Sequence, residues 1–112
     1  MSQNAIDFIF DELKTRGLCS SRSSYSSDWL GRETSYYRSL QCKGREPSIE
    51  AQLNLAARLR SLGAYLEHSD HPTIATSGKV YLKLSHELLE ALLARAEADT
   101  ADAAFNLVSQ CG

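Results

Sequence analysis

The sequence has little of what marks several common protein classes. Its 112 residues include only two prolines, three cysteines and one tryptophan. No stretch approaches the roughly 18 consecutive apolar residues that a membrane helix needs. Residues 1–11 lack the basic and apolar regions of a secretory signal. These absences predict a cytoplasmic protein with no membrane-spanning segment.

The three cysteines do not form a recognisable set. Cys19, Cys42 and Cys111 are odd in number, far apart and not arranged as C-x-x-C. Neither a disulfide scaffold nor a zinc site is therefore indicated. We expect reduced, partly buried thiols, as is usual in a cytosolic protein.

Motifs for catalysis are also missing. The sequence contains no G-x-S-x-G elbow, phosphate-binding loop or H-E-x-x-H motif. The Ser-His-Glu run at residues 85–87 is consecutive, so its side chains diverge on a helix. The candidate metal ligands in the sequence are His68, Asp70 and His71, with His86 as a further one. Metal ligands need fixed geometry and supporting partners, so we interpret this group as polar loop and expect no enzymatic activity, metal or cofactor.

Composition and charge describe an ordinary globular domain with an uneven charge distribution. Apolar residues make up 43% and charged residues 23%, and the net charge is −2. Residues 14–48 contain seven basic and three acidic residues, whereas residues 49–112 contain five basic and eight acidic residues. This asymmetry predicts one surface that faces a polyanion on an otherwise acidic body.

The first half of the chain predicts short helices separated by glycines. Apolar residues at helical spacing predict a helix over residues 4–16. Six serines lie in residues 20–27, and we favour a short helix ending at Gly31 over a flexible linker because Trp29 has to be covered. Its candidate N-caps are Ser20, Ser21 and Ser23.

Two more helices follow. Thr34 is a candidate cap for a helix over residues 35–43, which Gly44 closes. Ser48 caps a longer helix whose apolar stripe runs from Ile49 to Leu62. Gly63 either ends this helix or lies within it.

The third quarter of the chain favours a small β-hairpin. Val80, Leu82 and Leu84 alternate with polar neighbours, and residues 73–76 and 79–84 flank Ser77–Gly78. The alternative is a longer helix that begins near Lys79. We prefer the hairpin because Ser85 resembles an N-cap, with Leu84 and Leu89 placed as a hydrophobic staple.

The end of the chain predicts helices again. Residues 86–98 have a strong apolar face, and a last short helix over residues 101–109 would bury Phe105 and Val108. The fold class is therefore mainly α: a compact domain of five to six helices with a small β-hairpin before the C-terminal helices. We divide it into residues 1–64 and a C-terminal segment of residues 65–112, packed together as one unit. Leu88 and Leu92 are candidates for a dimer or partner surface.

Residues 25–59 carry most of the functional information. Two short helices joined at Gly31 fit a helix-turn-helix unit, in which the second helix enters the DNA major groove. Leu30, Tyr37 and Leu40 would pack inside, and Arg38 is the best candidate for pairing with guanine. The candidates for contact with base edges are Thr34, Ser35, Tyr36, Arg38 and Ser39. The candidates for contact with phosphates are Arg22, Ser23, Ser24, Arg32, Lys43 and Arg45.

The same residues resemble a known family. Leu30-Gly31, Tyr37 and Leu40, the run Arg45-Glu46-Pro47-Ser48 and the following IEAQLNLAARL helix resemble the Cro/C1-type (XRE-like) helix-turn-helix, over about residues 4–62. The sequence departs from the family pattern in residues 23–29, which lack the usual glutamine and have one extra residue before Leu30. It also places Glu33 where the family has an uncharged turn residue.

The resemblance implies a bacterial transcription regulator that binds specific double-stranded DNA as a homodimer, reading the major groove with residues 34–43. A second hypothesis is a helix-turn-helix-like adaptor, such as an antitoxin or anti-repressor, that binds a protein partner instead of DNA. The net charge, Glu33 and the missing glutamine favour the adaptor. A third hypothesis is a regulator that senses a small ligand in an apolar cavity, although no residue points to a ligand.

Overall fold

The computed structural model describes the backbone of residues 5–111 and the side chains of residues 5–98. Its elements are α1 (Ala5–Thr15), α2 (Arg22–Ser24), the π-helical turn η1 (Tyr25–Trp29), α3 (Tyr36–Lys43), α4 (Ile49–Glu67) and α5 (Pro72–Cys111). Residues 5–111 contain no strand, so the mainly α prediction is confirmed. Within the same range, no helix combines the length and apolarity needed to cross a bilayer.

The short N-terminal elements form for the local reasons that the sequence indicated. α1 buries Ile6, Ile9, Phe10 and Leu13 along one face. The serine-rich stretch is helical and not a linker, because the Ser21 side chain accepts a hydrogen bond from the Ser24 amide, at 3.1 Å, and so caps α2.

The boundaries of α3 and α4 also follow local signals. Gly44 adopts the left-handed conformation, with φ of 62°, and ends α3. The Ser48 side chain accepts the Ala51 amide at 3.2 Å and caps α4. Gly63 lies inside α4, which continues to Glu67. Thr34 and Ser35 make no such cap for α3, whose N-terminus is held from another element, as described below.

The predicted β-hairpin is wrong. Residues 73–84 belong to α5, a single 40-residue helix that also includes the two C-terminal helices expected over residues 86–98 and 101–109. Gly78, Tyr81, Ser85 and Leu88 recur every three or four residues and are all buried, so the helical period outweighs the alternation of Val80, Leu82 and Leu84. The expectation that Phe105 and Val108 are buried concerns side chains outside the described part.

Ser85 is also not an N-cap. It lies within α5, 1% exposed, and its hydroxyl donates to the Ala56 carbonyl of α4 at 2.7 Å. The two helices come closest at two glycines. A Cβ on Gly63 would lie 2.8 Å from the Gly78 carbonyl oxygen, and a Cβ on Gly78 would lie 2.5 Å from the Glu67 amide nitrogen. Glycine at both positions therefore allows backbone contact between α4 and α5.

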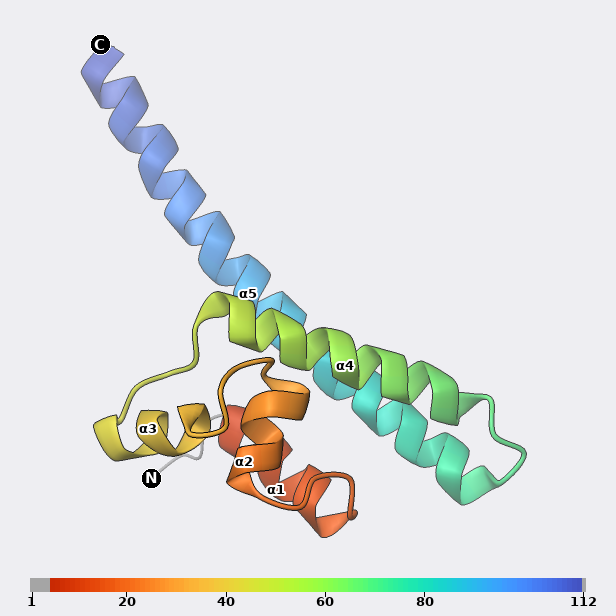
Figure 1. The fold of residues 1–112 in the computed structure, drawn as a ribbon. Coiled ribbons are helices and arrows are strands. Elements are labelled where there is room, and N and C mark those ends of the chain that lie inside the picture. Colours follow the sequence, from red (N-terminus) through yellow and green to blue (C-terminus); the bar gives the residue numbers. More distant parts are fainter. Residues whose placement is uncertain (1–4, 112) are drawn as a thin grey trace.

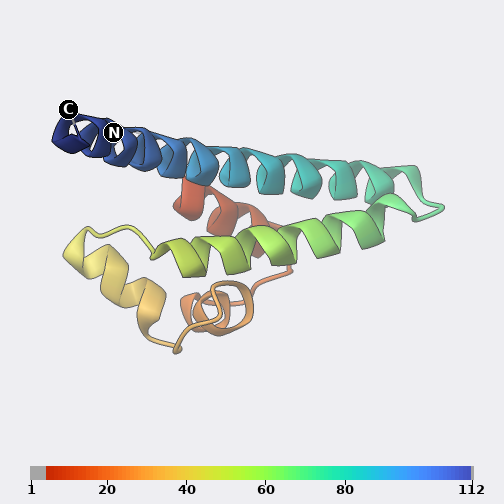
Figure 2. The same cartoon turned by 90° about the horizontal axis from the view of Figure 1, so that it is seen from above.

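The elements form a helical body from which α5 projects. α4 and the first half of α5 lie side by side, α1, α2 and α3 lie on one side of this pair, and the second half of α5 extends beyond the body (Figure 1; Figure 2). The long axis of the molecule measures 61 Å, against 34 and 27 Å for the other two. One continuous core joins residues from α1 to Leu88 of α5. Because α4 crosses residue 64 without a break, both predicted segments share this core.

Candidate nucleic-acid interface

The turn between η1 and α3 is fixed by contacts with α4. Leu30 is fully buried, and its carbonyl accepts a hydrogen bond from the Asn54 side chain at 3.1 Å. Gly31 has a φ of 67°, and a Cβ there would lie 2.7 Å from the Asn54 amide nitrogen. The Leu30-Gly31 pair therefore needs a glycine for both its backbone conformation and its closeness to α4.

A π-helical turn precedes this corner. The Leu30 amide donates to the Tyr25 carbonyl, five residues back, at 3.0 Å. Such a turn holds one residue more than an α-helical turn of the same span, and π-turns are often found at functional sites. Within η1, Tyr25 and Ser26 are fully buried, while Trp29 is partly buried against the core.

Ser26 anchors the beginning of α3. Its hydroxyl accepts the Tyr37 amide at 2.9 Å and donates to the Arg22 carbonyl, also at 2.9 Å. One of the first backbone amides of α3 is thereby satisfied by a side chain from η1, which replaces the cap expected from Thr34. Sequence reasoning missed Ser26, because a serine within a serine-rich run carries no signal that it is buried.

The inner face of α3 packs on an aromatic cluster. Tyr37 is 2% exposed and lies 5.2 Å from Phe10 and 4.8 Å from Tyr25, measured between ring centroids. Its hydroxyl donates to the Asp7 carboxylate, and the Tyr25 hydroxyl donates to the Ile6 carbonyl at 2.8 Å. Burial raises the pKa of both Tyr25 and Tyr37 far above the usual value, so both remain neutral donors.

The outer face of α3 and the turn before it are exposed. Of the predicted base-contacting residues, four are exposed: Thr34, Ser35, Arg38 and Ser39. Tyr36 is half-buried, and its hydroxyl accepts the Ser48 amide at 2.9 Å. The Arg32 guanidinium lies 5.2 Å from the centre of the Tyr36 ring. Tyr36 therefore links α3 to the start of α4 and supports Arg32.

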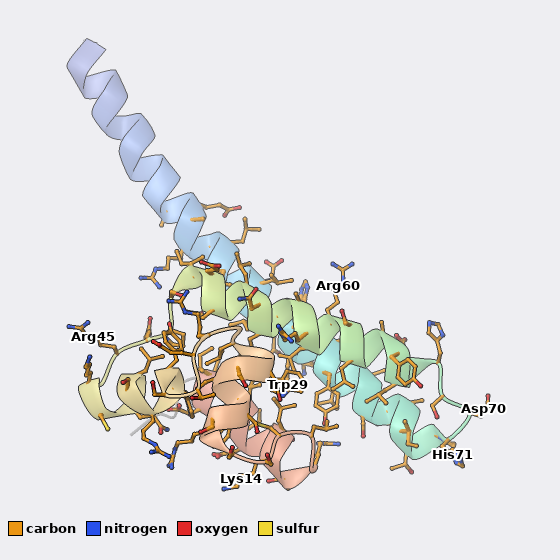
Figure 3. All side chains as sticks on the ribbon, viewed as in Figure 1. Lys14, Trp29, Arg45, Arg60, Asp70 and His71 are labelled. Carbon is orange, nitrogen blue, oxygen red and sulfur yellow. The ribbon has the colours of Figure 1, made fainter. Side chains whose placement is uncertain are left out.

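The predicted phosphate contacts surround α3. Arg22, Ser23, Arg32, Lys43 and Arg45 are exposed. Figure 3 shows Arg45 reaching outward beyond the end of α3. Ser24 differs, because it is half-buried and its amide and hydroxyl are bonded to Ser20 and Ser21.

The basic side chains around α3 keep their charges available. Among residues 5–98, Arg38, Lys43 and Arg45 make no ion pair with a carboxylate, whereas the nearby Glu46 pairs with Arg95 of α5 at 3.7 Å. Glu33, at the turn before α3, is exposed beside Arg32. The arrangement is a helix with a packed inner face, a polar outer face and basic groups at its edges. We call this surface the α3 face: Thr34, Ser35, Arg38 and Ser39 with Arg22, Arg32, Lys43 and Arg45.

The loop into α4 is closed by another residue that sequence reasoning overlooked. Pro47 is buried, and its carbonyl accepts a hydrogen bond from the Gln52 side chain at 2.9 Å. Gln52 is a polar residue in an apolar stripe, which is a weak signal for a buried hydrogen bond. This contact and the bond between Ser48 and Tyr36 fix the path of the Arg45–Ser48 loop at the edge of the α3 face.

The candidate residues for a partner surface and for a metal site lie outside the α3 face. Leu88 is 4% exposed within the core and Leu92 packs partly against it, so both contribute to contacts within one chain. Asp70 and His71 lie in the α4–α5 loop, at the opposite end of the body from α3 (Figure 3). Across residues 5–98 no three His, Cys, Asp or Glu side chains are placed to hold a metal ion. Cys19 is buried, which raises the pKa of its thiol, and its sulfur donates to the Ser21 carbonyl.

A family model matches residues 6–101, which include α2, η1, α3 and α4 in full and most of α1 and α5. The chain belongs to this family, DUF6626, which is described as a family of unknown function. No curated protein matched the chain, and no solved structure did. The matched range covers the whole α3 face and the first part of α5, so both are parts of the family's common region.

Proposed function

We propose that this DUF6626 protein binds specific sequences of double-stranded DNA as a transcription regulator, with α3 in the major groove and two copies on each site. The observation that carries the proposal is the division of α3 into two faces. Tyr37 is buried in the core and Leu40 is half-buried, while Arg38 and Ser39 are exposed; Arg38, Lys43 and Arg45 make no ion pair with a carboxylate within residues 5–98. A helix of this kind meets the needs of major-groove readout, in which side chains reach base edges and flanking cations contact phosphates.

The departures from the Cro/C1 pattern are compatible with this reading. The extra residue before Leu30 coincides with η1, where a π-turn takes up one additional residue. The Leu30-Gly31 corner therefore keeps its contact with Asn54 of α4. Arg22 and Ser23 are exposed in α2, the first helix of the helix-turn-helix unit. In the Cro/C1 pattern a glutamine at this place would contact a phosphate.

The number of charges argues for two copies. If four of the basic residues around α3 each neutralised one phosphate, the logarithm of the binding constant would fall with the logarithm of the salt concentration with a slope near −3.6. Such a slope weakens binding roughly a hundredfold between 50 and 200 mM salt. A single α3 face would therefore bind weakly in physiological salt, whereas two would read half-sites about one helical turn apart.

The test is selection from a pool of randomised duplex DNA at about 150 mM salt. We expect a recovered motif with two-fold symmetry, and Arg38→Ala should lower the affinity for it by about 5-fold to 150-fold, because a bidentate arginine–guanine pair contributes about 1–3 kcal/mol. Arg60→Ala is the matched control, since Arg60 is exposed on α4 away from α3 (Figure 3). Lys43→Ala should weaken binding to all sequences and reduce the salt slope by about 1.

An adaptor that binds a protein is the second candidate, and Glu33 favours it. An exposed carboxylate beside Arg32 weakens the positive potential where a phosphate would pass. A folded sample that retains no DNA in the selection would refute the regulator and leave the adaptor. Retention with no enriched sequence would refute specific readout and leave an electrostatic binder only.

A further inference from the structure

The molecule exposes more surface than a compact monomer of this size. The accessible surface is 7622 Å², whereas a compact protein of 12.4 kDa exposes about 6,100 Å². The radius of gyration is 16.9 Å, against about 13 Å for a compact chain of this length. The excess is roughly 1,500 Å², and a standard stable interface takes about 800 Å² from each partner.

The exposed surface is concentrated where α5 leaves the body. Every residue from Leu93 to Ala98 is exposed, so this stretch has no buried face. Most of the stability of a helix in a protein comes from packing an apolar face against other parts of the fold. The projecting half of α5 in Figures 1 and 2 therefore calls for a partner.

An apolar groove lies beside the turns of α5 that come just before this stretch. It has a volume of about 350 Å³ and lies between α1 and α5, where Phe8, Leu84 and Ala91 contribute to its lining. Phe8 is 45% exposed, although its neighbour Ile9 is buried. Large exposed aromatic groups beside an apolar groove are typical of a protein contact surface.

We propose that this surface binds a second copy of the same chain, with the two α5 helices antiparallel. The proposed seam, which we call the α5 seam, consists of Ala91, Ala94 and Ala98, and all three are exposed. The sequence continues the same spacing of three and four at Ala101, Phe105 and Val108, whose side chains lie outside the described part. This is the heptad spacing that holds two helices together. The choice of a second copy as the partner rests on the proposed function, whereas the place where it binds rests on the exposed surface of α5.

The order of residues favours the antiparallel arrangement. With a two-fold axis between residues 98 and 101, the sequence positions of Ala91 and Ala94 fall opposite those of Val108 and Phe105 in the other copy. Small positions then face large ones towards both ends of the seam, and Ala98 falls opposite Ala101 at its centre, which allows close packing. The end of the partner helix reaches the groove beside Phe8 and would cover it.

The charges favour the same arrangement. In an antiparallel pair, the heptad position of Arg95, which also pairs with Glu46 of its own chain at 3.7 Å, falls beside that of Asp102 of the other copy. This happens twice by symmetry, and no like charges meet at these flanking positions. In a parallel pair, the position of Arg95 would fall beside that of Glu90, but Glu97 would fall beside Asp102, and the repulsion would offset the attraction.

The experiment measures the molar mass of the full chain by light scattering between about 10 and 100 µM, without DNA. We expect twice 12.4 kDa. Ala94→Glu and Ala98→Glu should each weaken dimerisation at least tenfold, because each places a charge in the seam, which in a dimer excludes water. Ala57→Glu, at an exposed position on α4, is the matched control and should remain dimeric. A mass of 12.4 kDa throughout, or dimers unaffected by Ala98→Glu, would overturn the proposal.

The direction of the helices is tested with a short bis-maleimide in a Cys42→Ser/Cys111→Ser background. Ala98→Cys should cross-link between copies, because the axis lies nearby. Ala91→Cys should not, because its two copies would be about 25 Å apart along the antiparallel helices. Efficient cross-linking at residue 91 would indicate a parallel pair and contradict the inference. A dimer that selects no DNA would support this surface while refuting the proposed function, and a monomer that selects DNA would do the reverse.

Discussion

The close crossing of α4 and α5 makes a sharp prediction about Gly78. By helix propensity alone, Gly78→Ala inside α5 should stabilise the protein by about 1 kcal/mol. The structure predicts the opposite sign. The new Cβ would lie 2.5 Å from the Glu67 amide nitrogen and 2.7 Å from the Gly63 carbonyl oxygen. Both are backbone atoms that cannot rotate away, so the two helices must separate.

The expected loss follows from these two opposing effects. Overpacking a well-packed contact typically costs 1–3 kcal/mol, and a clash with backbone belongs at the upper end, about 3 kcal/mol. After the gain in helix propensity, Gly78→Ala should lower the free energy of unfolding by about 2 kcal/mol and Tm by roughly 8 °C. Urea unfolding followed by circular dichroism at 222 nm measures the first quantity, and a thermal scan the second.

Two further variants separate the crossing from other causes. Gly63→Ala should also destabilise, because its Cβ would lie 2.8 Å from the Gly78 carbonyl oxygen and from Leu82. The double variant should cost less than the two single changes added together, because helices already forced apart leave room for the second methyl group. Ala57→Gly, on the exposed side of α4, measures the propensity effect alone. A Gly78→Ala protein more stable than the wild type would refute the helix crossing.

Two other predictions concern α3 and the cluster beneath it. Ser26→Ala should lower the free energy of unfolding by about 1–3 kcal/mol, because the Tyr37 amide loses its buried acceptor. Ser27→Ala is the control, because the Ser27 hydroxyl bonds only to neighbouring residues. It should change the free energy of unfolding by less than about 0.5 kcal/mol in the same urea titration. The raised pKa of Tyr25 and Tyr37 predicts a pH dependence, since burial favours the neutral phenol in the folded state. The contribution of the two phenols to the free energy of unfolding is fully present below pH 10, the usual tyrosine pKa. It is lost as the pH rises above 10, at up to about 1.4 kcal/mol per pH unit for each group. Tyr37→Phe should make this decline shallower between pH 10 and 11.5, and an unchanged slope would show that Tyr37 titrates equally in both states.

Where one local signal acted alone, the sequence was sufficient to place an element. The cap at Ser48, the stop at Gly44 and the apolar face of α1 each depend on residues within one or two turns. The same holds for the two-faced pattern of α3, because inward Tyr37 and outward Arg38 follow from helical spacing. Local rules therefore predicted the exposed part of the candidate site, the part that a ligand would meet.

The errors occurred where contacts distant in the sequence decide the structure. The sequence of residues 73–84 fits both a strand pattern and a helix pattern. The choice depends on the close contact with Gly63 of α4, where a Cβ on Gly78 would lie 2.7 Å from the Gly63 carbonyl oxygen. Ser85 has the sequence features of an N-cap, but its hydroxyl bonds to Ala56, 29 residues away. Leu88 was predicted at a partner surface and is buried in the core of its own chain, because a stripe of leucines gives no information on which molecule covers it.

Ser26 connects the unusual first helix to the surface that we propose meets DNA. In an ordinary α-helical turn the positions between Tyr25 and Leu30 would be rotated differently, and η1 adds one residue at this point. In this turn Ser26 faces α3 and bonds to its second amide, so η1 also supplies the cap that Thr34 and Ser35 do not provide. The orientation of α3 then depends on η1 as well as on the aromatic cluster. Changes in the serine run should alter DNA affinity through the position of Arg38, even at residues that contact no phosphate.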